Sequence, residues 1–99
     1  MTTYDFGYGP VPARRHRNPD GSEGGWVADT ATVRSTVHVG RNAKVYNNAI
    51  VRGFTLLTEN AVVKDSAVVE GSSWIADNAI IGGETHLIGE TVGGRRKML

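Results

Sequence analysis

Aliphatic residues recur at every sixth position through two thirds of the chain, and this recurrence constrains the fold more than any other feature. Eleven consecutive positions at this spacing are Val, Leu or Ile: Val27, Val33, Val39, Val45, Val51, Leu57, Val63, Val69, Ile75, Ile81 and Leu87. The positions four residues further on are almost all Ala, Ser or Thr, from Ala31 to Thr91. A period of six gives no single buried stripe on a helix, and 66 residues far exceed one strand. Short strands separated by corners fit both registers, with the aliphatic and the small residue pointing inward.

The repeat resembles that of the hexapeptide-repeat family, whose motif is an aliphatic residue, a small or acidic one, two free positions, a small residue and a free one. The resemblance covers residues 27–92. It implies an all-β fold, a left-handed parallel β-helix with three hexapeptides in each triangular coil. The left hand is implied by the family alone, since crossovers between parallel strands are otherwise right-handed.

Coils of eighteen residues would place residues eighteen apart above one another, about 4.8 Å per level. We therefore expect about three and a half to four coils, with ladders such as Val27-Val45-Val63-Ile81 inside. Asn42, Asn60 and Asn78 fall in one corner column, where asparagine tolerates a left-handed conformation.

The sequence divides into an extended N-terminal arm (1–25), the β-helix (26–92) and a basic C-terminal tail (93–99). The arm fits no hexad and holds all three prolines. We expect it to cap the first coil, whose exposed edge would otherwise invite aggregation, and to cover one face.

Several outward positions carry apolar side chains, where a monomeric prism should be polar. Such a patch implies a covering surface, and a symmetric oligomer is the usual solution. Because the family commonly forms parallel trimers, we expect a homotrimer. The interface residues expected are Ile50, Leu56, Val68, Trp74 and Val92.

Arginines suggest an anion site near the first coil. Arg34 and Arg52 are eighteen residues apart and should stack at one corner, where Glu70 or a bound phosphate could neutralise them. The basic segment before the coils and nearby aromatic residues complete the expected ligand-binding set, which is Arg14, Arg15, His16, Arg17, Trp26, Arg34, His38, Tyr46, Arg52 and Phe54. The ligand class expected is a small anion, nucleotide-like, bound where subunits meet.

Other chemistry finds little support in the sequence. There is no cysteine, and His38 and His86 would lie on the order of 12 Å apart along the axis, so we expect no metal site. No nucleophile motif or phosphate-binding glycine loop occurs, so we expect no catalytic residue and no cofactor. A net charge of +1 is neutral with respect to nucleic acid, and we expect neither nucleic acid nor a membrane as partner. With no apolar leader at the start, the expected location is cytoplasmic.

Two alternatives to a binding module stay open. The larger branch of the family comprises coenzyme A-dependent acyltransferases with a catalytic histidine, which would give His38 or His86 the role of general base. The opening segment, "VPARRHRNPDGSEGG", also resembles that of small phage and prophage proteins of this family. This second resemblance implies a phage-encoded module, for capture of a signalling nucleotide or for assembly of a particle.

Overall fold

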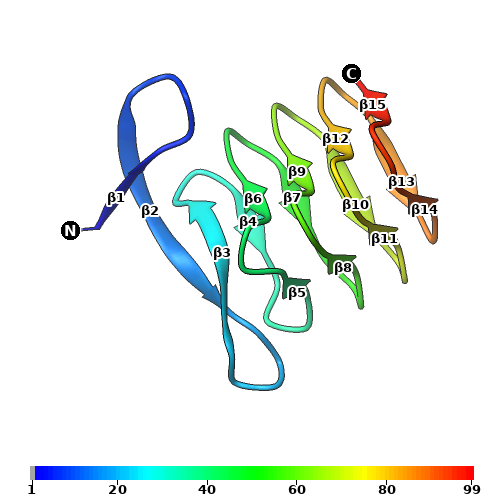
Figure 1. The fold of residues 1–99 in the computed structure, drawn as a ribbon, viewed down its shortest axis with the longest axis horizontal. Helices are drawn as coiled ribbons and strands as arrows, with labels where there is room; N and C mark the ends of the chain where they lie inside the picture. The colour runs from blue at the N-terminus through cyan, green and yellow to red at the C-terminus, as the bar shows by residue number, and fades with distance from the viewer. Residues whose placement is uncertain (1) are drawn as a thin grey trace.

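The computed structural model describes residues 2–99, and this part of the chain is built from short strands that form three sheets (Figure 1). The first sheet has the order β1-β2-β3-β6-β9-β12-β15, the second β13-β10-β7-β4 and the third β14-β11-β8-β5. The strands are β1 (Thr3–Asp5), β2 (Pro10–Arg17), β3 (Glu23–Ala28), β4 (Thr32–Val33), β5 (His38–Val39), β6 (Lys44–Val45), β7 (Ile50–Val51), β8 (Leu56–Leu57), β9 (Val62–Val63), β10 (Val68–Glu70), β11 (Trp74–Ile75), β12 (Ile80–Ile81), β13 (His86–Ile88), β14 (Thr91–Val92) and β15 (Lys97–Met98). Within residues 2–99 no helix is long and apolar enough to cross a membrane.

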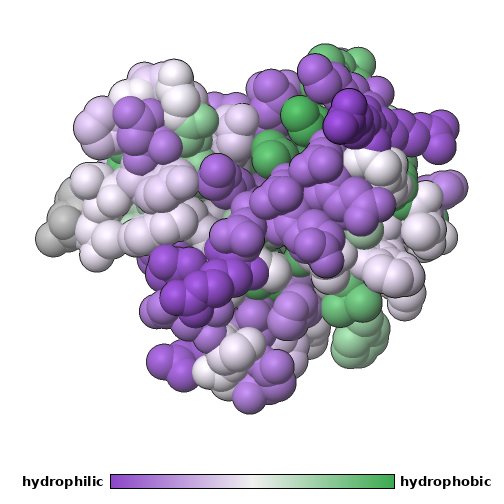
Figure 2. Space-filling view, in the orientation of Figure 1, coloured by the Kyte–Doolittle hydropathy of each residue, from purple (hydrophilic) through white to green (hydrophobic). Residues whose placement is uncertain are grey.

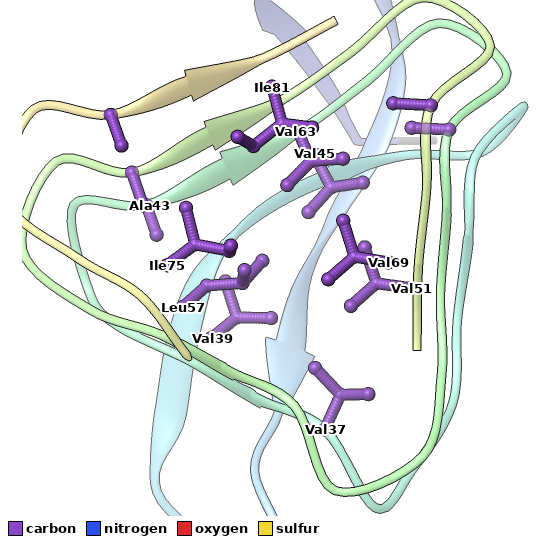
Figure 3. Packing of buried hydrophobic residues seen from close by; sticks show 14 of the residues in the cluster. Val37, Val39, Ala43, Val45, Val51, Leu57, Val63, Val69, Ile75 and Ile81 are labelled. Carbon is purple, nitrogen blue, oxygen red and sulfur yellow. The ribbon is translucent and has the colours of Figure 1, made fainter. Parts of the chain in front are cut away.

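The three sheets are the faces of a parallel β-helix of about four coils, as the repeat predicts. Strands eighteen residues apart pair in parallel, so Val27 lies beside Val45, Val45 beside Val63 and Val63 beside Ile81. The equivalent ladders on the other faces start at Val33 and Val39. Figure 3 shows the labelled members of these ladders, among them Val45, Val63 and Ile81, pointing into the space that the three faces enclose. β-branched side chains favour such a pleated interior.

Small residues occupy the inner side of the corners, where the chain turns from one face to the next. Ala43, Ala49, Ala61 and the equivalent positions are buried. In one corner column the inward residues are Val37, Thr55 and Ser73. The hydroxyls of Thr55 and Ser73 each donate to the carbonyl three residues earlier, that of Arg52 or Glu70, at 2.9 Å. Small side chains are needed there because the backbone bends tightly around them, and the buried hydroxyls keep their hydrogen bonds.

The last coil is one residue shorter than the others, so after Leu87 the inward positions lie one residue earlier than the six-residue period predicts. Ile75 pairs with Val92 and Ile81 with Met98, a separation of seventeen residues in both cases. The shortening falls in the corner after β13, where Gly89 has a φ of 63°. Val92 is therefore buried (3 % exposed), and its assignment to an outward slot and an interface was wrong. Residues 93–99 likewise do not leave the body as a tail, because Lys97–Met98 forms β15.

The N-terminal arm is a hairpin that extends the first sheet beyond the first coil. β2 pairs antiparallel with β1 on one side and with β3 on the other. Aromatic side chains of the arm cover the outer surface of the sheet. The Tyr4 ring stacks on Trp26, with ring centroids 4.9 Å apart, and Phe6 stacks on Tyr46 at 4.8 Å. The hairpin thus both caps the first coil and covers the first face, and β2 protects the edge of β3.

Side chains at the end of the arm also occupy the exposed edge of β5. Asn18 accepts a hydrogen bond from the Val39 N–H (2.8 Å) and donates one to the Val39 carbonyl (3.2 Å), as the backbone of a neighbouring strand would. His16 is buried and its Nε2 lies 2.7 Å from the Val37 carbonyl oxygen. The arm crosses the prism so closely that a Cβ on Gly25 would lie 1.8 Å from the Ala43 carbonyl oxygen. The first coil is therefore closed by one strand and two polar side chains.

Candidate functional site

A hollow of about 290 Å³ opens at the corner between the second and third faces, in the first two coils. It is lined by Arg34, Ser35, Thr36, Arg52 and Gly53. Arg34 and Arg52 follow β4 and β7 directly, and because these strands pair in register the two arginines occupy equivalent positions one coil apart. The Thr36 hydroxyl donates to the Gly53 carbonyl at 2.5 Å, which ties the two turns together.

The charge of this hollow is positive. Arg52 donates from Nε to a Glu70 carboxylate oxygen at 2.9 Å, whereas Arg34 takes part in none of the ion pairs within residues 2–99. The second oxygen of Glu70 contacts Nε2 of His86. The hydrogen bond from Arg52, followed by that from His86, lowers the pKa of Glu70. The carboxylate of Glu70, in the next coil, thus neutralises the charge of Arg52, while the charge of Arg34 has no such partner among residues 2–99.

The same corner presents apolar side chains to solvent. Phe54, which follows Gly53, is 72 % exposed, and Ile88 is 63 % exposed in the equivalent corner two coils further on. On the third face Leu56 and Trp74 are 42 % and 47 % exposed. Ile50 and Val68, on the second face, are half-buried. This corner and the two faces that meet at it therefore carry apolar side chains that gain from being covered.

Figure 2 shows one face of the molecule, on which hydrophilic residues predominate while a small hydrophobic group projects at the lower right. Within the third face, the Trp74 indole N–H donates to the Thr58 hydroxyl at 2.9 Å, so the ring is held in place against the sheet. His38 also points outward from β5 and is half-buried. A fixed and half-exposed tryptophan is a side chain typical of protein contacts.

The basic residues of the arm do not join Arg34 and Arg52 in one site. Arg14 pairs with Asp29 at 3.3 Å, and Arg15 donates to the Gly24 carbonyl at 3.0 Å and lies near Glu23. Arg17 is exposed at the end of β2. Arg14 thus joins the arm to the first coil, while Arg15 and Arg17 line a separate hollow of about 110 Å³ together with His16, Gly21 and Glu23.

His16 also serves the junction between the arm and the coils. Burial lowers the pKa of His16, and the charges of Arg14 and His38 act in the same direction, while the hydrogen bond to Val37 opposes them. A neutral imidazole that donates from Nε2 to the Val37 carbonyl fits this environment.

Two of the aromatic residues expected to stack on a ligand are engaged by the arm instead. Tyr4 covers Trp26, and the Arg15 guanidinium carbon lies 5.3 Å from the centroid of the same ring. Tyr46 is packed by Phe6 and Tyr8. Of the predicted aromatic set, Phe54 is exposed and directly follows Gly53 in the chain, which lines the hollow of Arg34 and Arg52.

Sequence reasoning did not assign Ser35, Thr36 and Gly53 to the site, nor the contact between Glu70 and His86. The eighteen-residue period contains the signal for the first three, since they occupy the corner segments next to Arg34 and Arg52. His86 is opposite Val68 in the paired strands, so its reach to Glu70 is diagonal along the sheet. Such a diagonal contact depends on side-chain direction, which the repeat does not specify.

Within residues 2–99 no group of three His, Asp or Glu side chains is arranged to hold a metal ion. Comparison with protein-family models, with curated protein sequences and with solved structures finds no match.

Proposed function

We propose that this protein is a non-catalytic binding module that assembles as a homotrimer and captures a small anionic, nucleotide-like ligand at its subunit junctions. The observation that carries the proposal is the hollow in which Arg34 has no carboxylate partner among residues 2–99 and Arg52 has one. Guanidinium groups bind phosphate through paired N–H donors, and hydroxyls of Ser35 and Thr36 add neutral donors beside them.

The exposed apolar side chains at this corner and on the third face support assembly there. A neighbouring copy that covered Phe54, Leu56 and Trp74 would remove large apolar surfaces from water and would also close the hollow to solvent. Exclusion of water strengthens the attraction between the arginines and an anion. Assembly and ligand capture would therefore support each other at this corner, and we propose that the exposed Phe54 ring stacks on a base of the ligand.

The resemblance of the repeat to the hexapeptide-repeat family agrees with this proposal, because proteins of that family commonly form parallel trimers. The looser similarity of the arm to small phage proteins suggests that the module is phage-encoded and that its ligand is a signalling nucleotide of the host. The location proposed is the cytoplasm.

The proposal is tested by measuring the native mass and then nucleotide binding. Native mass spectrometry should give a trimer, and calorimetry with mono-, di- and cyclic nucleotides should detect binding at micromolar concentration. Loss of a charge-assisted hydrogen bond in Arg34→Ala or Arg52→Ala should weaken binding about 10- to 100-fold. Arg14→Ala, whose side chain pairs with Asp29, is the matched control and should bind as the wild type does. A monomer, or no binding by any nucleotide, refutes the proposal.

A second candidate function rests on the contact between Glu70 and His86. A histidine oriented by a carboxylate is the arrangement of a general base, and acyl transfer from coenzyme A would use it. This alternative predicts turnover of an acyl-coenzyme A that His86→Ala abolishes and Arg34→Ala leaves intact. A third outcome, assembly beyond a trimer with no ligand bound, would instead favour a structural role in a particle.

A further inference from the structure

A second hollow, of about 340 Å³, lies between the N-terminal hairpin and the corner that joins the first and second faces. Three separate segments line it. The hairpin contributes Tyr8, Val11 and Pro12, the first coil contributes Asp29 and Thr30, and the second coil contributes Asn47 and Asn48. Its volume is within the range of about 300–1,000 Å³ that small-molecule sites occupy.

The walls of this hollow are tied to one another. The Asp29 N–H donates to the Pro12 carbonyl at 2.9 Å, which joins the hairpin to the first coil. The Thr30 hydroxyl donates to the Asn47 carbonyl at 2.6 Å, which joins the first coil to the second. The Tyr8 ring lies 5.9 Å from Tyr46 and is still 52 % exposed. The hollow is thus formed before any ligand arrives, so little ordering cost opposes binding.

The charge of this hollow differs from that of the arginine site. Its one charged lining residue, Asp29, is paired with the Arg14 guanidinium at 3.3 Å, so the pair is neutral as a unit. Among residues 2–99, no Lys, Arg or His lines this hollow to attract a phosphate. A ligand selected here is therefore uncharged.

The lining combines an aromatic ring with planar hydrogen-bonding groups. Asn48 is exposed, and its amide offers two N–H donors and one acceptor. Asp29 offers a second carboxylate oxygen, since the contact with Arg14 uses only one, and Tyr8 adds a phenolic hydroxyl. A sugar ring has a face of C–H groups that packs on an aromatic ring and a rim of hydroxyls that both donate and accept. We propose that this hollow binds a neutral sugar, with Tyr8 against the ring face and with Asp29 and Asn48 on the hydroxyls.

The proposal is tested by titrating the isotopically labelled full-length protein with galactose, mannose and N-acetylglucosamine and following amide chemical shifts. For a ligand of this size in an open site we expect a dissociation constant on the order of 1 mM for at least one sugar. The shifted amides should include those of Tyr8, Thr30 and Asn48. Tyr8→Ala and Asn48→Ala should each weaken binding about 10-fold, while Tyr8→Phe keeps the ring and should bind nearly as well.

Controls separate this site from the arginine hollow. Phe54→Ala, which removes the exposed aromatic ring of the other corner, and Arg34→Ala should leave sugar binding unchanged. The proposal is overturned if no sugar shifts these amides, if Tyr8→Ala binds as well as wild type, or if adenosine binds here and the sugars do not. Binding of a sugar phosphate alone, lost in Arg34→Ala, would also overturn it and would instead assign the ligand to the arginine site.

Discussion

Asn18 gives the sharpest test of how the arm closes the first coil. Its side chain donates to the Val39 carbonyl and accepts from the Val39 N–H, and Val39 is fully buried. Asn18→Ala removes both partners, so two buried backbone groups lose their hydrogen bonds. Each such loss costs about 1–3 kcal/mol, and because the two share one side chain we expect about 3 kcal/mol in total. For a chain of this size that lowers the melting temperature by about 12–24 °C.

Urea denaturation followed by circular dichroism at one fixed protein concentration measures this loss, because association would otherwise change the apparent stability. Asn42→Ala, at an exposed corner position, is the matched control and should change stability by less than about 0.5 kcal/mol. If Asn18→Ala were no more destabilising than Asn42→Ala, the edge of β5 would not depend on this amide, and the account of the cap would be wrong.

Three further predictions concern the coils and the junction with the arm. Leu57→Ala should lower the free energy of unfolding by about 2–5 kcal/mol because the side chain is fully buried. Leu56→Ala, one residue away and facing outward, should change the stability of a dilute monomer by less than about 0.5 kcal/mol. Equal effects of the two variants in urea titrations would contradict the alternation of inward and outward residues. Burial lowers the pKa of His16, so protonation favours the unfolded chain, and thermal stability should fall as pH drops below the ordinary histidine range. His16→Gln can still donate to the Val37 carbonyl and should lack this part of the fall. A pH profile of the variant identical to that of the wild type would contradict the prediction. Gly25→Ala should prevent docking of the arm, because the new Cβ would lie 1.8 Å from the Ala43 carbonyl oxygen. Ala28→Gly should only weaken docking, and thermal melts of the two variants measure the difference. A Gly25→Ala protein as stable as the wild type would exclude this close approach.

The sequence predicts the body of the fold well because a repeat states the same packing rule many times over. Val27, Val45, Val63 and Ile81 each lie where the six-residue period places them. The rule fails at the corner of Gly89, where one residue is missing. The predicted register places Thr91 in the small slot but Gly93 in the aliphatic slot, whereas the observed register places Val92 in the aliphatic slot but Glu90 in the small slot. Each register satisfies one of the two patterns, so the repeat alone does not choose between them.

Corner conformations were predicted less well than the faces. The positive φ angles fall on Glu59 and Asp77, one residue before Asn60 and Asn78. Two of the stacked side-chain amides nevertheless bond along the axis, with Nδ2 of Asn60 donating to Oδ1 of Asn78 at 3.1 Å. The sequence fixes which residues share a column, while the residue that adopts the left-handed conformation depends on how each corner closes.

The candidate sites depend on features that a one-dimensional pattern does not contain. The stacking of Arg34 over Arg52 follows from the period, and so does the approach of Glu70 to Arg52. The covering of Trp26 by Tyr4 and the second hollow beside Tyr8 depend on the path of the arm, which belongs to no repeat. The repeat therefore predicts contacts between coils, and it does not predict the contacts that the arm makes.

The uniform pairing of β6 with β9 and of β9 with β12 gives the molecule an adjustable height. Each level presents to the next the same row of backbone donors and acceptors. An extra eighteen-residue coil inserted between Val63 and Ile81 would therefore pair on both sides without disturbing the hairpin or the residues that line the two hollows. Duplication of a segment of the gene can thus lengthen the prism in steps of about 4.8 Å, and a longer relative would keep both hollows at the same end.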